Sequence, residues 1–246
     1  MCPDRLRALL GRLDLTRLAP DDDADSVAAF CATAASRHGA PAAVCILPAF
    51  VELAARTLDR HGLSGTVRVA TVANFPGGDR PVDAVFAGIE RSLADGADEI
   101  DLVLPWRDLV AGRIEQAAAL LDGARKRSSG ATLKVILETG ALTGRQLDRA
   151  ADLALDHGAD FLKTSTGVDH PGASPEAAGR LLQRISARRA PCGLKVSGGI
   201  RTIDAASAYL ALAEQRMGPD WPSPERFRIG ASGLLDRLLE ALDASR

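Results

Sequence analysis

Four short apolar runs of this chain each enclose one charged residue: Asp101, Lys134, Lys163 and Lys195. Short apolar runs are typical of buried strands, and burying Lys or Asp without a partner costs free energy. Because side chains alternate along a strand, the apolar neighbours of each charge face one side of a sheet and the charge faces the other. Glu138 follows Lys134 by four residues and has the same parity. We therefore expect these five side chains to share one interior, with Glu138 at the end of its strand.

A lysine in such an interior can act as a nucleophile. Burial and a neighbouring cation both lower the pKa of an ammonium group, which yields free amine at neutral pH. A free amine attacks a carbonyl carbon and forms an imine. Lys163 and Lys195 lie on consecutive runs, so one can be the nucleophile and the other the cation that lowers its pKa. The pattern does not decide which lysine has which role.

A structural ion-pair cluster is the alternative interpretation of the same residues. Three lysines and two carboxylates make a poor structural plug, because truncating or mispairing any member leaves a buried charge. Perturbed titratable groups gathered in a cleft favour a functional site. We therefore favour catalysis over a plug.

The charged runs belong to an alternation of apolar and amphipathic segments that covers the chain. Eight strands are expected at 13–18, 43–47, 67–73, 99–104, 132–137, 160–163, 193–196 and 227–229. Eight helices are expected to follow them, at 26–37, 50–60, 82–94, 109–127, 145–156, 175–188, 203–217 and 233–242. Residues 1–10 have the pattern of an additional amphipathic helix. Gly after a His or Asp marks four of the helix ends, at 38–39, 61–62, 95–96 and 157–158.

This alternation predicts a parallel sheet with right-handed crossovers. Eight units of about 31 residues fit a single α/β domain, a (β/α)8 TIM barrel with an extra N-terminal helix, over residues 1–246. An open doubly wound sheet is the alternative, but it usually has fewer strands and a Gly-rich turn after the first one, which is missing after residues 13–18. In a barrel the carboxyl ends of the strands carry the catalytic site, and Glu138 falls at such an end.

Glycine-rich turns follow the seventh and eighth expected strands, at 197–202 and 230–233. These two loops are the usual phosphate site of the barrel, because glycine lets backbone N–H groups approach an anion and helix N-termini favour negative charge. Glycine at such turns also has a purely geometric explanation. We favour a phosphate because the two motifs occur together. The residues expected at it, with the turn after strand six included, are Thr166, Gly167, Gly198, Gly199, Arg201, Gly230 and Ser232.

Other chemistry-bearing residues carry weaker signals. Asn74 ends the third expected strand and either touches substrate or simply forms the Asn-Phe-Pro turn. His170 is the one histidine away from a helix end, and no second His or carboxylate stands at metal-ligand spacing. We therefore expect no metal and no cofactor.

Composition narrows the partners of the chain. A formal net charge of -2 and 46% hydrophobic residues argue against disorder and against a dedicated nucleic-acid binder. No apolar run suggests a membrane span or a signal peptide, and the cysteines at 2, 31, 45 and 192 form no disulfide or zinc pattern. We expect a cytoplasmic protein with small-molecule partners. We also expect a homodimer, because symmetric dimers are common among soluble enzymes.

With these residues in view, the sequence resembles the deoxyribose-phosphate aldolases. The matching segments follow the family's order along nearly the whole chain, and those around Lys163 and Lys195 are very specific. They lie at 14–16, 70–76, 96–101, 133–140, 158–167 and 195–202.

The resemblance implies a class I, metal-independent aldolase. Its substrate would be 2-deoxy-D-ribose 5-phosphate, cleaved reversibly to acetaldehyde and D-glyceraldehyde 3-phosphate. Lys163 would form the Schiff base, while Asp101 and Lys195 would transfer protons and tune the amine. The supporting residues implied are Lys134, Glu138, Asn74, Asp14 and Thr16.

The chain departs from better-known members of that family in three places. Val168 stands where some carry a lysine, Gly233 stands where some carry a second serine, and a tyrosine-ended tail is missing. The first two changes remove possible phosphate contacts. They leave open an aldolase of this fold with a different or non-phosphorylated acceptor aldehyde. A non-catalytic sugar-phosphate-binding barrel is the alternative from another functional class.

Overall fold

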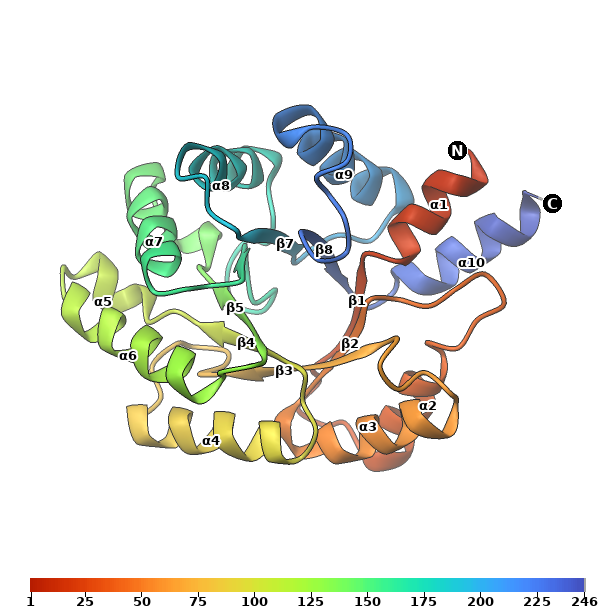
Figure 1. The fold of residues 1–246 in the computed structure, drawn as a ribbon, viewed down its shortest axis with the longest axis horizontal. Coiled ribbons are helices and arrows are strands. Elements are labelled where there is room, and N and C mark those ends of the chain that lie inside the picture. Colours follow the sequence, from red (N-terminus) through yellow and green to blue (C-terminus); the bar gives the residue numbers. More distant parts are fainter. Residues whose placement is uncertain (246) are drawn as a thin grey trace.

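The computed structural model describes residues 1–245 and contains a closed barrel of eight parallel strands, β1 to β8, in sequence order around the barrel (Figure 1). Strand β1 pairs with β8 and closes the sheet. The TIM barrel predicted from the alternating pattern is confirmed. The strands are β1 Leu13–Arg17, β2 Ala43–Ile46, β3 Arg68–Ala73, β4 Glu99–Val103, β5 Thr132–Ile136, β6 Phe161–Lys163, β7 Gly193–Ser197 and β8 Phe227–Ala231.

Helices surround the barrel on its outer face, as Figure 1 shows. Two short 3-10 turns, Pro48–Phe50 and Thr139–Ala141, follow β2 and β5. The α-helices are α1 Pro3–Leu10, α2 Ala24–Ala32, α3 Val51–Arg60, α4 Val82–Ala94, α5 Trp106–Val110, α6 Ile114–Arg127, α7 Gly144–Asp156, α8 Pro175–Ala187, α9 Ile203–Met217 and α10 Leu234–Ala244.

The additional N-terminal helix is present as α1. Its buried face consists of Leu6, Leu9 and Leu10, and it packs against α9 and α10. The two ends of the chain consequently lie on the same side of the barrel (Figure 1).

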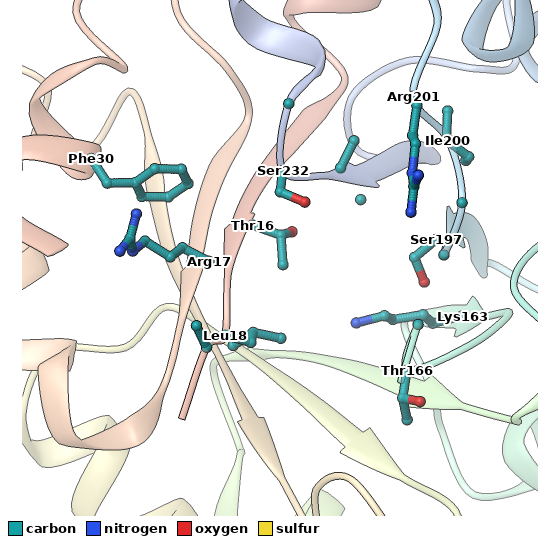
Figure 2. Close-up of a pocket in the computed structure, with 17 residues that line it drawn as sticks. Thr16, Arg17, Leu18, Phe30, Lys163, Thr166, Ser197, Ile200, Arg201 and Ser232 are labelled. Atoms are coloured by element: carbon teal, nitrogen blue, oxygen red, sulfur yellow. The ribbon is translucent and has the colours of Figure 1, made fainter. Parts of the chain in front are cut away.

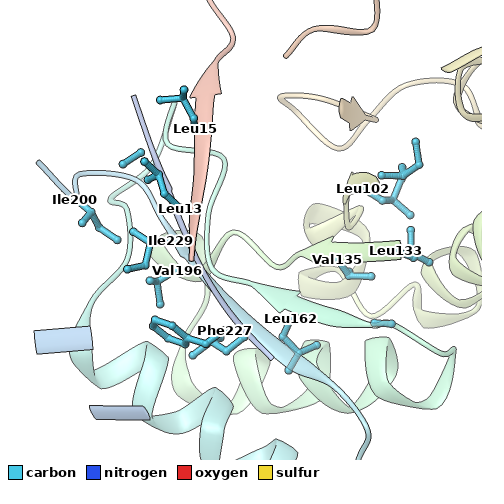
Figure 3. Packing of buried hydrophobic residues seen from close by; sticks show 14 of the residues in the cluster. Leu13, Leu15, Leu102, Leu133, Val135, Leu162, Val196, Ile200, Phe227 and Ile229 are labelled. Carbon is cyan, nitrogen blue, oxygen red and sulfur yellow. The ribbon is translucent and has the colours of Figure 1, made fainter. Parts of the chain in front are cut away.

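The apolar core lies between the strands and the helices. Outward-facing strand residues such as Leu133, Val135, Val196 and Phe227 form it, and Figure 3 shows them on their strands above the helices. The inward-facing residues of β2 and β3 form a small separate apolar cluster of Ala43, Cys45, Ala70 and Val72. The charged residues of the interior come from the remaining strands, which also contribute apolar side chains such as Phe161 on β6.

Two helix predictions are wrong in their bounds. The helix expected at 109–127 is two helices, because Gly112 adopts a left-handed φ of 81° and reverses the chain between α5 and α6. The helix expected at 26–37 ends at Ala32, after which residues 33–35 form tighter turns. Gly39 therefore stops no helix, whereas Gly62, Gly96 and Gly158 follow helix ends as predicted.

Across residues 1–245 no helix is long and apolar enough to cross a membrane. All four cysteines are free, and Cys31, Cys45 and Cys192 are buried.

Candidate active site

Seven charged side chains meet inside the barrel and form what we call the interior charge cluster. Asp101, Lys134, Lys163 and Lys195, expected together from the sequence, all belong to it. Each is buried, and Lys163 is 2% exposed. The full cluster consists of Asp14 on β1, Glu99 and Asp101 on β4, Lys134 on β5, Lys163 on β6, Lys195 on β7 and Arg228 on β8.

Asp101 lies at the centre of the cluster and accepts from three lysines. Its Oδ2 is 2.7 Å from Lys163 Nζ and 2.7 Å from Lys195 Nζ. Its Oδ1 is 2.9 Å from Lys134 Nζ. The strand register explains this convergence, because Asp101 pairs with Lys134 across β4 and β5, and Lys163 pairs with Lys195 across β6 and β7.

Asp14, Glu99 and Arg228 form the part of the cluster nearer the amino ends of the strands. Arg228 reaches both carboxylates, with Nη1 2.7 Å from Asp14 Oδ1 and Nη2 3.0 Å from Glu99 Oε1. Lys134 Nζ is 2.5 Å from Glu99 Oε2, and Lys195 Nζ is 2.5 Å from Asp14 Oδ2.

Sequence reasoning missed Glu99 and Arg228, although the signal was available. Arg228 stands between Phe227 and Ile229, which is the same pattern of one charge inside an apolar run. Glu99 shares the parity of Asp101, so alternation along β4 turns both carboxylates inward.

The lysines of the cluster differ in protonation. Burial disfavours the charged forms of Lys134 and Lys195, but neighbouring carboxylates outweigh it and raise the pKa of both lysines. For Lys163, burial lowers the pKa, Asp101 offsets only part of that effect, and the nearby Lys195 ammonium lowers the pKa further. Lys163 is therefore the cluster lysine whose free amine is most available.

The surrounding cations favour the ionised forms of Asp101 and Asp14. Burial alone favours the neutral form of Asp101, but the surrounding lysines hold its pKa well below the ordinary value. The same balance of burial against Lys134, Lys195 and Arg228 lowers the pKa of Asp14. The cluster contains three acidic and four basic side chains, so it has one more basic group than acidic groups.

Lys163 opens onto a cavity of about 550 Å³ at the carboxyl ends of the strands. Figure 2 shows its amine directed into this space below Thr16, with Ser197 and Arg201 on one side and Arg17 beside Phe30 on the other. All seven residues predicted for a phosphate site line the same cavity: Thr166, Gly167, Gly198, Gly199, Arg201, Gly230 and Ser232.

The loops of that cavity depend on glycine. Gly198 has a φ of 89°, and a Cβ there would come 2.8 Å from the Cα of Gly172, so the loops after β6 and β7 pack backbone against backbone. Helix α9 begins just beyond, with the Thr202 side chain capping it, and α10 begins after Gly233. The loop residues just before the two helix starts, up to Arg201 and Gly233, line the cavity wall, so their backbone N–H groups are near it.

Glu138 is outside the interior charge cluster, contrary to expectation. Strand β5 ends at Ile136 and Glu138 has a left-handed φ of 56°, so the alternation that relates it to Lys134 no longer applies. Its carboxylate instead accepts from the backbone N–H and the hydroxyl of Thr166, the latter at 2.6 Å. Glu138 thereby fixes the loop whose Thr166 lines the cavity.

Asn74, Thr16 and Val168, all singled out from the sequence, lie in different surroundings. Asn74 forms the turn, because its amide donates to the Val103 carbonyl at 2.9 Å and accepts from the Arg80 N–H at 2.9 Å. It lines a separate, mostly apolar cavity rather than the one containing Lys163. The Thr16 side chain faces the Lys163 cavity, whereas Val168 is 56% exposed.

The chain has only four lysines, and three of them belong to the interior charge cluster. The fourth, Lys126, is exposed on α6. Among the described side chains, no group of three or more His, Cys, Asp or Glu is arranged to hold a metal ion.

Comparison with known proteins agrees with this geometry. Residues 10–235 match the family described as DeoC/LacD family aldolase. The deoxyribose-phosphate aldolase of Agrobacterium fabrum is 45% identical over 235 residues, which cover 95% of this chain and 90% of that protein. The chain belongs to the DeoC/LacD family of aldolases. The lysine-lined barrel interior is thus the interior of an aldolase.

Solved structures resemble this DeoC/LacD family aldolase over nearly its whole length. A Toxoplasma gondii protein, itself only provisionally assigned as a deoxyribose-phosphate aldolase, gives a TM-score of 0.87 at 29% identity and covers 99% of this chain and 96% of that one. The deoxyribose phosphate aldolase from Aeropyrum pernix gives a TM-score of 0.79 at 27% identity, covering 98% and 94%. These similarities agree with the closed barrel and its N-terminal helix.

Proposed function

We propose that this aldolase cleaves 2-deoxy-D-ribose 5-phosphate reversibly to acetaldehyde and D-glyceraldehyde 3-phosphate through an imine on Lys163. The observation that carries the proposal is the position of Lys163. It is the one cluster lysine with a lowered pKa. Its amine faces the cavity that is lined by the glycine-containing loops after β6, β7 and β8. Identity to the Agrobacterium fabrum enzyme supports the choice of substrate.

The reaction begins with addition of the Lys163 amine to the aldehyde carbon C1 of the open-chain sugar. Loss of water gives a protonated imine, which draws electrons from the bond between C2 and C3. The hydroxyl on C3 gives its proton to Asp101, directly or through water, as that bond breaks. D-Glyceraldehyde 3-phosphate leaves, and an enamine stays on Lys163.

The second half returns the lysine to its starting state. Lys195 Nζ donates to Asp101 Oδ2 at 2.7 Å, so a proton taken up by this carboxylate can be returned through the pair to C2 of the enamine. Protonation gives the imine of acetaldehyde, and addition of water releases acetaldehyde and the free amine.

The phosphate would bind at the wall of the cavity opposite Lys163. Backbone N–H groups of the loops after β7 and β8 supply donors for the anion, and Ser232 adds a hydroxyl. Arg201 and Arg17 are the two cationic side chains besides Lys163 in this lining. The Nε of Arg17 is held 2.6 Å from Asp22 Oδ1, which fixes its guanidinium at the rim.

Val168 and Gly233 are the residues that favour a second candidate, an aldolase that uses a non-phosphorylated acceptor. Neither side chain can donate to a phosphate. Acetaldehyde release from 2-deoxyribose 5-phosphate and from 2-deoxyribose, measured as kcat/KM, separates the two candidates. The proposal requires a clear preference for the phosphorylated sugar, and equal rates would favour the second candidate.

A non-catalytic binding barrel gives a third result in the same experiment. It would bind the sugar phosphate and release no acetaldehyde.

A cytoplasmic location and a homodimer stay predictions from the sequence.

A further inference from the structure

The numbers of ion-pair partners differ among the basic groups of the interior charge cluster. Lys134 Nζ lies within 3.3 Å of three carboxylates, and Lys195 Nζ lies within 2.7 Å of two. Arg228 also pairs with two. For Lys163, Asp101 is the single carboxylate within ion-pair distance among the described residues.

This difference depends on Arg228 and Glu99. Arg228 occupies one oxygen of Asp14, so Asp14 offers only its other oxygen to the lysines. Glu99 pairs with Arg228 through Oε1 and with Lys134 through Oε2. Asp101 must therefore serve Lys195 and Lys134 as well as Lys163, which leaves Lys163 with the least compensation for a positive charge.

We propose that Arg228 and Glu99 are positioning residues for imine formation, which act on Lys163 with opposite signs through Asp14 and Lys134. Arg228 favours the free amine of Lys163, and Glu99 limits that effect. The proposal rests on the proposed function only in taking Lys163 as the nucleophile. Neither residue lines the cavity that contains Lys163. Both line a separate cavity of about 480 Å³, together with Thr132 and Phe161 from the starts of β5 and β6.

Arg228 is held in place by contacts outside the cluster. Its Nε donates to the Pro224 carbonyl, and its guanidinium lies over the Phe161 ring, 5.7 Å from the centroid. These contacts keep the guanidinium between Asp14 and Glu99.

Four further charged side chains line the same cavity as Arg228 and Glu99, namely Arg68 at the start of β3, Asp98, Asp160 and Glu225. None of the ion pairs among the described residues joins one of these four to the cluster. On β2, the Cys45 thiol lies 4.0 Å from Asp101 Oδ2, and burial raises its pKa, so it stays neutral. On β3 the inward residues Ala70 and Val72 carry no charge. The inward charges of the other strands are those of the cluster itself: Asp14, Glu99, Asp101, Lys134, Lys163, Lys195 and Arg228.

Changing the two residues moves the protonation of Lys163 in opposite directions. In Arg228→Gln, both oxygens of Asp14 become available to Lys195 and Lys134, so Asp101 is freer to stabilise a protonated Lys163. In Glu99→Gln, Lys134 loses its 2.5 Å partner and depends more on Asp101, which disfavours a protonated Lys163. The double variant removes one charge of each sign and restores the balance.

The test is the pH dependence of Lys163 acetylation by acetic anhydride, followed by peptide mass analysis without substrate. Lys126 on the same chain is the internal reference, because it is exposed and outside the cluster. In Arg228→Gln we expect the Lys163 midpoint to rise by about one pH unit, the effect of one neighbouring charge. Glu99→Gln should lower it by a similar amount, and the double variant should return it to the wild-type value.

Two further variants separate electrostatics from packing. Arg228→Lys keeps the charge and should keep the wild-type midpoint, although lysine lacks the guanidinium that contacts Asp14 Oδ1 and Glu99 Oε1 together. Arg180→Gln removes an arginine that pairs with both oxygens of Asp148 on the helix surface, and it should also leave the midpoint unchanged.

An unchanged midpoint in folded Arg228→Gln, or a displaced one in Arg228→Lys, overturns the proposal. If Arg228→Gln does not fold, the other two variants test the proposal. A displaced Lys163 midpoint in the double variant, or an unchanged midpoint in Glu99→Gln, contradicts the proposal. Labelling needs no turnover, so failure of the proposed aldolase activity would appear separately, as absent acetaldehyde release with intact midpoint shifts.

Discussion

Lys163 and Lys195 lie directly across from each other in the register of β6 and β7, and both of their Nζ atoms are 2.7 Å from the same oxygen, Asp101 Oδ2. Two ammonium groups on one carboxylate oxygen repel each other, so one proton is held less tightly than the other. Lys195 has Asp14 as a second partner and Lys163 does not. The weaker proton is therefore on Lys163, the lysine that opens into the cavity.

Replacing Lys195 by Met tests this relationship. Burial and the Lys195 ammonium both lower the pKa of Lys163. Removing that ammonium therefore raises the pKa and leaves Lys163 as the one lysine at Asp101 Oδ2, while Lys134 stays at Oδ1. Free amine then appears only at higher pH. We expect the acid limb of kcat/KM to move upward by about one pH unit and the value on that limb to fall about tenfold. Lys126→Met on α6 is the control, and an unmoved acid limb in Lys195→Met would contradict the shared-carboxylate account.

Replacing Asp101 by Asn should separate imine formation from bond cleavage. The variant lacks the oxygen that takes the proton from the C3 hydroxyl, and we expect kcat to fall by about 10²–10⁴-fold. Imine formation should persist, because Asp101 raises the pKa of Lys163 and its loss makes the amine more available. Borohydride trapping compared with steady-state rates measures both. Equal losses in trapping and turnover would mean that Asp101 serves only the fold.

Eight strands and the inward direction of their charges could be predicted from the sequence, because alternation along a strand is a local property. The prediction for Glu138 was wrong because that rule ends with the strand. Residue Ile136 is the last of β5, and the left-handed backbone at Glu138 turns its carboxylate to Thr166.

The pairing within the cluster could not be predicted in the same way. Arg228 reaches Asp14 because β8 closes the barrel beside β1, with Leu13 opposite Ile229. These residues are far apart in the chain, and only the register of the closed sheet determines which carboxylate each cation meets. The lowered pKa of Lys163 depends on its number of partners. The pattern of charges in the sequence therefore left the choice between Lys163 and Lys195 open, and only the family resemblance favoured Lys163 at that point.

Adding a cation at the exposed position 168 should strengthen phosphate binding. Val168 follows Thr166 and Gly167 of the cavity wall, lines the neighbouring apolar cavity with Asn74 and is 56% exposed, so a longer side chain has room there. For Val168→Lys we expect KM for 2-deoxyribose 5-phosphate to fall by up to about tenfold, equivalent to about 1.4 kcal/mol of binding. Turnover of 2-deoxyribose should stay the same.

The matched control for that variant is Val82→Lys, which adds the same charge at another exposed valine, at the start of α4. A similar gain in both variants would indicate general attraction rather than a phosphate contact. A gain toward both sugars in Val168→Lys would contradict the position given to the phosphate.

Stability should depend on pH through the buried carboxylates. The folded-state pKa of Asp14 is lowered because Lys134, Lys195 and Arg228 outweigh its burial. The unfolded chain therefore binds this proton first, and the stability that Asp14 contributes is present above about pH 4 and lost as pH falls below it.

Asp14→Asn should flatten that dependence and destabilise the fold at neutral pH by about 3–5 kcal/mol, because it leaves buried cations without a partner. Urea unfolding between pH 7 and pH 3 measures both effects. Asp4→Asn is the control, since the Asp4 side chain is exposed on α1. An unchanged pH slope in Asp14→Asn would mean that Asp14 is not ionised in the folded protein.

The most direct measurement is borohydride reduction of the protein with 2-deoxyribose 5-phosphate, followed by intact-mass and peptide mass analysis. With only four lysines in the chain, the modified one is identified without ambiguity. We predict one adduct, on Lys163, and none in Lys163→Arg, which keeps the charge but forms no imine and should release no acetaldehyde. An adduct on Lys195 in the wild-type protein, or continued cleavage by Lys163→Arg, would contradict the assignment of Lys163 as the nucleophile.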